Sequence, residues 1–137
     1  MGPAFWRTYD RMLVATGRTL LRVTTLTTRL AATVDAVGAA LEAADDLVIT
    51  GCASLGVLRV GVAEDEPRLL AEAIERLRAF VADGEGSVVV ERGSSALRAR
   101  VDPWGAVAPG PLDLMRALKQ TFDPRGILNP GRFVAGI

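Results

Sequence analysis

Hydrophobic residues follow two different periods along the chain, and the change from one to the other predicts the secondary structure. Four short stretches, rich in β-branched and apolar residues and bounded by turn signals, are typical of strands. Between them, apolar residues recur every three or four positions, which is typical of helices with one buried face. The predicted strands cover residues 19–25, 47–52, 57–62 and 87–91. The predicted helices cover residues 3–15, 26–44, 65–82 and 111–122.

Between residues 19 and 91 the predicted order is strand, helix, strand, strand, helix, strand. This is the split βαβ arrangement of ferredoxin-like domains, an α+β fold (βαββαβ) with both helices on one face of an antiparallel sheet. A C-terminal helix and an ordered tail follow. The other face of the sheet must be solvated or covered by a partner or by the tail. The residues expected there are Arg22, Thr24, Arg59 and Gly61.

Local signals refine these elements. Either Thr27 or Thr28 is expected to cap the start of the second helix, and Gly38 is expected to allow close packing of that helix on the sheet. The spacing of Glu72 and Arg76 favours a weak ion pair on the outer face of the third helix.

Three further expectations concern single residues and links. Cys52 is expected to be a small buried hydrophobe of its strand. Alternating residues at 97–101 are compatible with a short edge strand, and Trp104 is expected to anchor a loop with its ring.

Residues 1–16 place aromatic and apolar residues on one face of a short helix, begun by a proline. This segment is either an N-terminal helix packed on the domain or a connector from a preceding domain, and the sequence favours neither. The apolar face consists of Phe5, Trp6, Tyr9, Met12 and Leu13.

The tail after the last helix is rich in proline and glycine. Each proline moves the residue before it out of helical geometry, and each glycine tolerates a positive φ. Two successive tight turns are therefore predicted, Asp123–Gly126 and Asn129–Arg132. The apolar pair Ile127 and Leu128 is expected to hold the segment down between them.

Composition excludes several classes of function. Sixteen basic residues balance sixteen acidic residues, so no excess charge points to nucleic acid or an anionic membrane. One cysteine permits no internal disulfide, and the absence of histidine removes every Ser-His or Cys-His catalytic arrangement. We find no signal peptide and no apolar run long enough to span a bilayer, and we expect a cytoplasmic protein.

No self-sufficient catalytic constellation stands out, and no catalytic residue can be named. Neither familiar glycine-rich phosphate loop is present. The acidic clusters at 45–46 and 64–66 lie at element boundaries and are expected to be solvated caps, so no metal site is predicted. Arg92, at the end of a strand, could bind the carboxylate of a substrate. The competing interpretation is an ordinary surface arginine.

The tail also carries a family resemblance. Phe-Asp-Pro-Arg-Gly-Ile-Leu-Asn-Pro-Gly-Arg-Phe (122–133), behind an amphipathic helix at 114–120, resembles the C-terminal signature of FAD-linked oxidases of the vanillyl-alcohol oxidase type. That signature reads FDPxGILNPG followed by Arg or Lys. Among members, the match looks closest to the FAD-binding (E-type) subunit of bacterial glycolate oxidase. The C-terminal domains of this family also resemble the fold predicted above.

The resemblance implies part of an FAD-dependent oxidoreductase that oxidises a 2-hydroxy acid. In this family an N-terminal domain holds most of the FAD, and a C-terminal domain, here residues 17–137, covers the isoalloxazine ring. It further implies that the second turn of the tail packs near the flavin. The implied cofactor-binding residues are Asn129, Pro130, Gly131 and Arg132.

The chain departs from the family in lacking the FAD-binding domain and the histidines that many members use. We therefore expect a C-terminal fragment or separate domain, inactive by itself. Its expected partners are an FAD-binding domain or other oxidase subunits, and a small 2-hydroxy acid. The alternative is a free-standing ferredoxin-like module that binds or assembles through its open sheet face without catalysis.

Overall fold

The chain is organised as two compact units, Met1–Pro103 and Trp104–Ile137. Three residues of the acidic clusters considered above, Asp45, Glu64 and Asp65, lie outside the described residues. The computed structural model describes residues 2–15, 18–44, 46–63 and 66–137.

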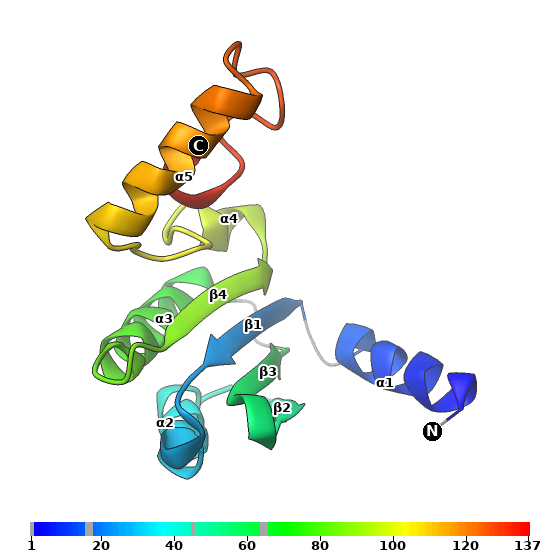
Figure 1. Cartoon of the computed structure of the whole chain (residues 1–137). Helices are drawn as coiled ribbons and strands as arrows, with labels where there is room; N and C mark the ends of the chain where they lie inside the picture. Colours follow the sequence, from blue (N-terminus) through cyan, green and yellow to red (C-terminus); the bar gives the residue numbers. More distant parts are fainter. Residues whose placement is uncertain (1, 16–17, 45, 64–65) are drawn as a thin grey trace. The chain divides into compact units, whose positions relative to one another are not determined.

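The first unit contains the predicted order of strands and helices (Figure 1), so the α+β, ferredoxin-like prediction is confirmed. The strands are β1 (Thr19–Thr24), β2 (Val48–Cys52), β3 (Val57–Val62) and β4 (Ser87–Arg92). The helices are α1 (Pro3–Ala15), α2 (Leu30–Ala40), α3 (Pro67–Ala82) and the short α4 (Ser95–Arg98). Single 3-10 turns precede α2 (η1, Thr27–Arg29) and join β2 to β3 (η2, Ala53–Leu55).

The four strands pair in the order β2-β3-β1-β4, and every pairing is antiparallel. The two strands that are followed by crossover helices, β1 and β3, therefore occupy the centre of the sheet, as the split βαβ arrangement requires. Leu21 of β1 lies opposite Val60 of β3 and Val90 of β4. Because facing residues share one side of a sheet, this register gathers apolar side chains on one face.

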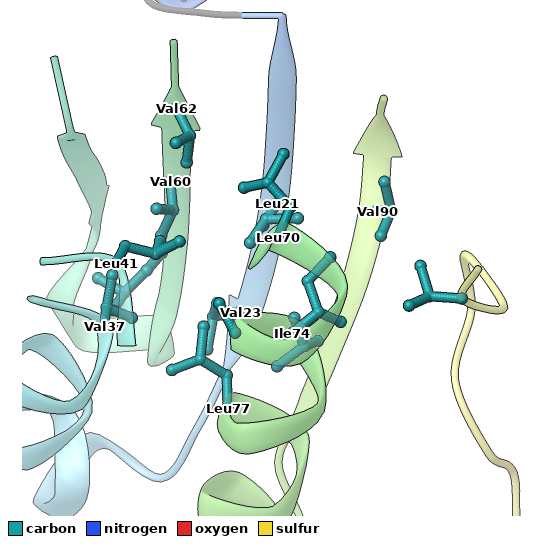
Figure 2. Packing of buried hydrophobic residues seen from close by; sticks show 14 of the residues in the cluster. Leu21, Val23, Val37, Leu41, Val60, Val62, Leu70, Ile74, Leu77 and Val90 are labelled. Atoms are coloured by element: carbon teal, nitrogen blue, oxygen red, sulfur yellow. The ribbon is translucent and has the colours of Figure 1, made fainter. Parts of the chain in front are cut away.

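The core lies between that face and helices α2 and α3 (Figure 2). The helical stripe of α3 contributes its buried residues at spacings of three and four, as the sequence pattern predicts. Val37 and Leu41 from the region of α2 close the other side. The sheet contributes Leu21, Val23, Leu58, Val60, Val62, Val88 and Val90.

The second helix starts and stops differently from the prediction. Thr27 and Thr28 lie inside η1, and the residue before α2 is Arg29, whose side chain makes no capping hydrogen bond. The helix ends at Ala40, not near residue 44, and the Arg76 guanidinium donates to the Ala40 carbonyl at 3.0 Å. This long-range bond satisfies a carbonyl that the helix end leaves without an intrahelical partner.

Two other local predictions are wrong. The first is the ion pair between Glu72 and Arg76. Glu72 instead lies 3.9 Å from Arg68, one turn earlier in α3, and Arg76 donates a hydrogen bond to the carbonyl at the end of α2. Residues 97–101 do not form an edge strand, because the Ser94 hydroxyl accepts from the Leu97 amide and starts α4 there. At the outer edge of β4, where the edge strand was expected, the Val90 amide donates a hydrogen bond to the Pro103 carbonyl at 2.8 Å.

Gly38 does not mediate close packing, since a β-carbon placed there would meet nothing within 4 Å. We expect Gly38→Ala to raise the free energy of unfolding by up to about 1 kcal/mol, because alanine is the better helix former. The matched control is Gly56→Ala. There φ is +61° and a β-carbon would lie 2.0 Å from the Thr25 carbonyl oxygen, so stability should fall. Urea denaturation of both variants checks this, and a destabilised Gly38→Ala would contradict it.

The second unit consists of α5 (Pro109–Phe122) and the tail, which closes with a 3-10 turn, η3 (Val134–Gly136). Two prolines at the start of α5 fit its first turn, where backbone amides have no intrahelical acceptor. The half-buried Trp104 packs its ring edge-on against Phe133, with ring centroids 5.1 Å apart. The aromatic ring thus anchors its loop, as expected.

Candidate functional site

The sheet face turned away from α2 and α3 carries a cluster of arginines around one carboxylate. Arg22 lies opposite Arg59 on the two central strands, and Thr24 and Gly61 belong to the same face, as predicted. The Glu91 Oε2 atom lies 3.2 Å from Arg59 Nε, and its Oε1 atom lies 3.8 Å from Arg22 Nε. The single negative charge of Glu91 faces the two positive charges of Arg22 and Arg59, so the cluster has a net positive charge.

Arg92, the predicted substrate-binding residue, lies at the end of β4 opposite Leu20. The register of β1 and β4 shifts between Leu20 and Leu21, as at a β-bulge. Such a bulge places two consecutive residues against one partner and re-aims their side chains. Glu91 and Arg92 therefore both belong to the open face, which the alternation of β4 alone does not predict.

An apolar wall stands beside this cluster. The Tyr9 hydroxyl of α1 shares a 3.3 Å hydrogen bond with the Thr50 hydroxyl of β2. Phe5, Trp6 and Tyr9 stack edge to face along α1. A cavity of about 580 Å³ is lined by these rings together with Arg22, Gly51, Cys52, Leu55, Val57 and Arg59. Aromatic rings opposite guanidinium groups suit an anionic ligand with an apolar part.

Cys52 lines the same cavity and is exposed, so the prediction of a buried hydrophobe is wrong. The register pairs it with Val57, at the end of the edge strand β2 and on the open face. A hydrogen bond with the Ser54 hydroxyl, at 3.3 Å, lowers the pKa of the thiol, and the Leu55 backbone acts in the same direction.

In the second unit, the tail forms both predicted turns. The Gly126 amide donates to the Asp123 carbonyl at 2.9 Å, and the Arg132 amide donates to the Asn129 carbonyl at 3.2 Å. Asn129 itself has a φ of +46°, the left-handed region that asparagine tolerates better than most residues. The four implied cofactor-binding residues therefore form one compact turn.

The tail is fixed by a polar clip that sequence reasoning missed. The Asp123 carboxylate is buried at the end of α5 and accepts from the Ile127 and Leu128 amides at 3.0 and 2.9 Å. Lys119 Nζ lies 2.6 Å from Asp123 Oδ2 and donates to the Leu128 carbonyl at 2.5 Å. Ile127 and Leu128 are exposed, so the expected apolar attachment of the tail is wrong. We call Lys119 and Asp123 the clip.

The clip gives the tail a pH dependence with a defined sign. The hydrogen bond from Lys119, followed by that from the Leu128 amide, lowers the pKa of Asp123 from 3.8 to about 2. A carboxylate with a lowered pKa stabilises the fold fully above its unfolded pKa, and this contribution is lost as the pH falls toward 2. NMR titration of the Ile127 and Leu128 amides should show a midpoint near 2, absent in Asp123→Asn. A midpoint near 4 would contradict the clip.

A groove of about 490 Å³ lies between α5 and the tail. Its walls are mostly apolar, and two of the implied cofactor-binding residues, Asn129 and Arg132, line it. The other lining residues are Met115, Leu118, Lys119, Phe122, Leu128, Phe133 and Ile137. The predicted site residues therefore fall into two groups, the Asn129–Arg132 turn in this unit and Arg92 in the other.

Across the described ranges, no three histidine, cysteine, aspartate or glutamate side chains gather where they could hold a metal ion. Within the same ranges, none of the helices has the length and apolar character needed to cross a membrane.

Comparison with known proteins agrees with the motif in the tail. The family model described as "FAD linked oxidases, C-terminal domain" matches residues 23–133, which include strands β2 to β4, α5 and the Asn129–Arg132 turn. No curated protein matches the chain. Since the match covers most of the chain, this protein belongs to the family of C-terminal domains of FAD-linked oxidases.

Proposed function

We propose that this domain completes the flavin site of an FAD-linked oxidase that acts on a small 2-hydroxy acid in the cytoplasm. FAD is held mainly by a partner FAD-binding domain, and the tail motif resembles that of the glycolate oxidase FAD-binding subunit. One observation carries the proposal: the Asn129–Arg132 turn is held in place by the clip and lines an apolar groove.

The chemistry of this turn fits a flavin. The Asn129 amide offers both donors and an acceptor, as the polar edge of an isoalloxazine ring requires. Gly131 has a φ of +69° and open space where a β-carbon would be, so a planar group can approach its backbone. Phe122 and Phe133 supply apolar walls. When bound, the flavin supplies the redox chemistry by accepting the hydride of the substrate alcohol carbon.

Arg92 is proposed to bind the substrate carboxylate, supported by its place on the positively charged open face. A guanidinium binds a carboxylate through two parallel hydrogen bonds, which a lysine cannot reproduce. No residue is assigned as the catalytic base.

For the complex with an FAD-binding domain, we expect Arg92→Leu to raise the KM for the 2-hydroxy acid by about tenfold. Arg92→Lys should recover part of this loss, since it restores the charge. Steady-state kinetics with glycolate and lactate measure both. An unchanged KM in Arg92→Leu would show that Arg92 is a surface arginine.

The proposed function is tested by supplying an FAD-binding domain, from the same gene or its neighbour, as a second polypeptide. We expect this chain alone to show weak or no FAD binding by fluorescence titration. The complex should hold FAD, and a 2-hydroxy acid should bleach its flavin absorbance under anaerobic conditions. Tight binding of FAD by the chain alone would mean that the cofactor site is misplaced. A complex that no 2-hydroxy acid reduces would favour the non-catalytic binding module.

A further inference from the structure

The cavity between α1 and the open face of the sheet has no part in the proposed function. Its volume of about 580 Å³ falls within the range of roughly 300 to 1,000 Å³ that small-molecule sites occupy. Arg92 is not among its described lining residues, and the Asn129–Arg132 turn belongs to the other unit. The family match begins at residue 23, so α1 and Arg22 lie outside it. Neither the proposed function nor the family match therefore assigns a ligand to this cavity.

The charged side chains that line the cavity are both arginines. Arg22 and Arg59 take part in the lining, and each side chain is 42% exposed. Glu91 contacts both guanidinium groups but supplies only one negative charge. No carboxylate is found among the described residues that line the cavity itself. One positive charge is therefore left over, and a bound monoanion would balance it.

The aromatic side chains of α1 give the same cavity an apolar surface. Phe5 and Trp6 are 47% and 53% exposed, and their rings meet edge to face with centroids 5.3 Å apart. The Trp6 and Tyr9 rings have the same arrangement at 6.0 Å. The hydrogen bond between the Tyr9 and Thr50 hydroxyls connects this stack of rings to β2. The apolar part of a ligand would cover ring surface that otherwise faces water.

We propose that this cavity binds a monocarboxylate that carries an aromatic ring. The carboxylate pairs with Arg22 and Arg59, and the ring packs against Phe5 and Trp6. Glycolate and lactate lack such an apolar part, so they are not the ligands of this cavity. A phosphate monoester carries about 1.5 to 2 negative charges at neutral pH, more than the one positive charge left over. The proposal does not depend on the proposed function, because α1 and the sheet supply the whole site.

The first test is isothermal titration calorimetry of the chain alone, with 3-phenylpropanoate as the probe. Its neutral amide, 3-phenylpropanamide, should bind at least about tenfold more weakly, because the hydrogen bonds to a charged group are lost. Propanoate should be weaker by a similar factor of about ten, because it has no ring to pack on α1. Equal binding of the amide, or tighter binding of phenyl phosphate, would overturn the proposal. So would the absence of binding by 3-phenylpropanoate up to about 10 mM.

The second test locates the ligand through Cys52, which is exposed, lines the cavity and is the only cysteine of the chain. Saturating 3-phenylpropanoate should slow alkylation of this thiol by N-ethylmaleimide at least about threefold, since the bound molecule covers it. The amide at the same concentration should have little effect. Mass spectrometry of the intact chain measures the rate. Calorimetric binding without protection of Cys52 would place the ligand elsewhere and overturn the proposal.

The third test uses variants of the two kinds of lining residue. Arg59→Gln and Trp6→Ala should each weaken binding of 3-phenylpropanoate at least about tenfold. The matched control is Arg68→Gln, an exposed arginine on α3 that also contacts a glutamate and should leave the affinity unchanged. Circular dichroism verifies that the variants fold. Unchanged affinity in both cavity variants would overturn the proposal. Self-association in light scattering that Trp6→Ala abolishes would assign the aromatic surface to a second copy instead.

Discussion

Leu21→Ala is expected to lower the free energy of unfolding by about 2 to 5 kcal/mol. Leu21 is fully buried on the central strand β1, between Val60 and Val90 on the neighbouring strands. Truncation removes apolar contacts on both sides and leaves a cavity that the rigid sheet cannot close. Urea denaturation followed by far-ultraviolet circular dichroism measures the change, and an unchanged m-value would show that the unfolded state is not altered.

Leu69→Ala is the matched control for this prediction. Leu69 is also a leucine next to the core, but 43% of it is exposed on α3, so truncation there should cost less than about 1 kcal/mol. The assignment of the core would be wrong if the two variants lost equal stability.

Asp123→Ala is expected to release the tail while the first unit stays folded. The substitution removes the acceptor for the Ile127 and Leu128 amides and leaves the Lys119 ammonium without its carboxylate. Hydrogen bonds to a charged group are stronger than neutral ones. Exchange of the two amides with deuterium should therefore accelerate by on the order of tenfold to a hundredfold. Amides of β1 should exchange as before.

The conservative variant Asp123→Asn distinguishes charge from shape. An asparagine retains one acceptor oxygen but loses the ion pair with Lys119, so it should recover only part of the protection. Flavin reduction in the complex should follow the same ranking if the tail faces the flavin. Full protection of Leu128 in Asp123→Ala would mean that other contacts hold the tail.

The fold could be predicted from the sequence because the local signals for helices and strands agree with the overall topology. The alternating and 3.6-residue patterns give the order of elements, and right-handed crossovers leave one arrangement for them. Helix ends were less accessible. The end of α2 depends on a bond from Arg76, a residue 36 positions away, which no local pattern contains.

The site was predicted in part, for equally physical reasons. Proline and glycine determine backbone geometry directly, so both turns of the tail were found. The clip was missed because the spacing of Lys119 and Asp123 is that of an ordinary exposed ion pair on a helix. The burial of the Asp123 carboxylate is visible only in the structure. Cys52 was misjudged because its face depends on strand register, and Glu91 and Arg92 share a face only because of the bulge.

The clip also contains the only lysine side chain of the protein. Lys119 is the only lysine, so the one side-chain amine of this protein is the group that holds the tail closed. While the tail is closed, that amine contacts the Asp123 carboxylate and the Leu128 carbonyl, which slows its reaction with an acylating reagent, and it becomes accessible when the tail opens. The rate at which Lys119 is acylated would therefore measure how often the tail, with its Asn129–Arg132 turn, separates from α5. No probe has to be introduced for this measurement.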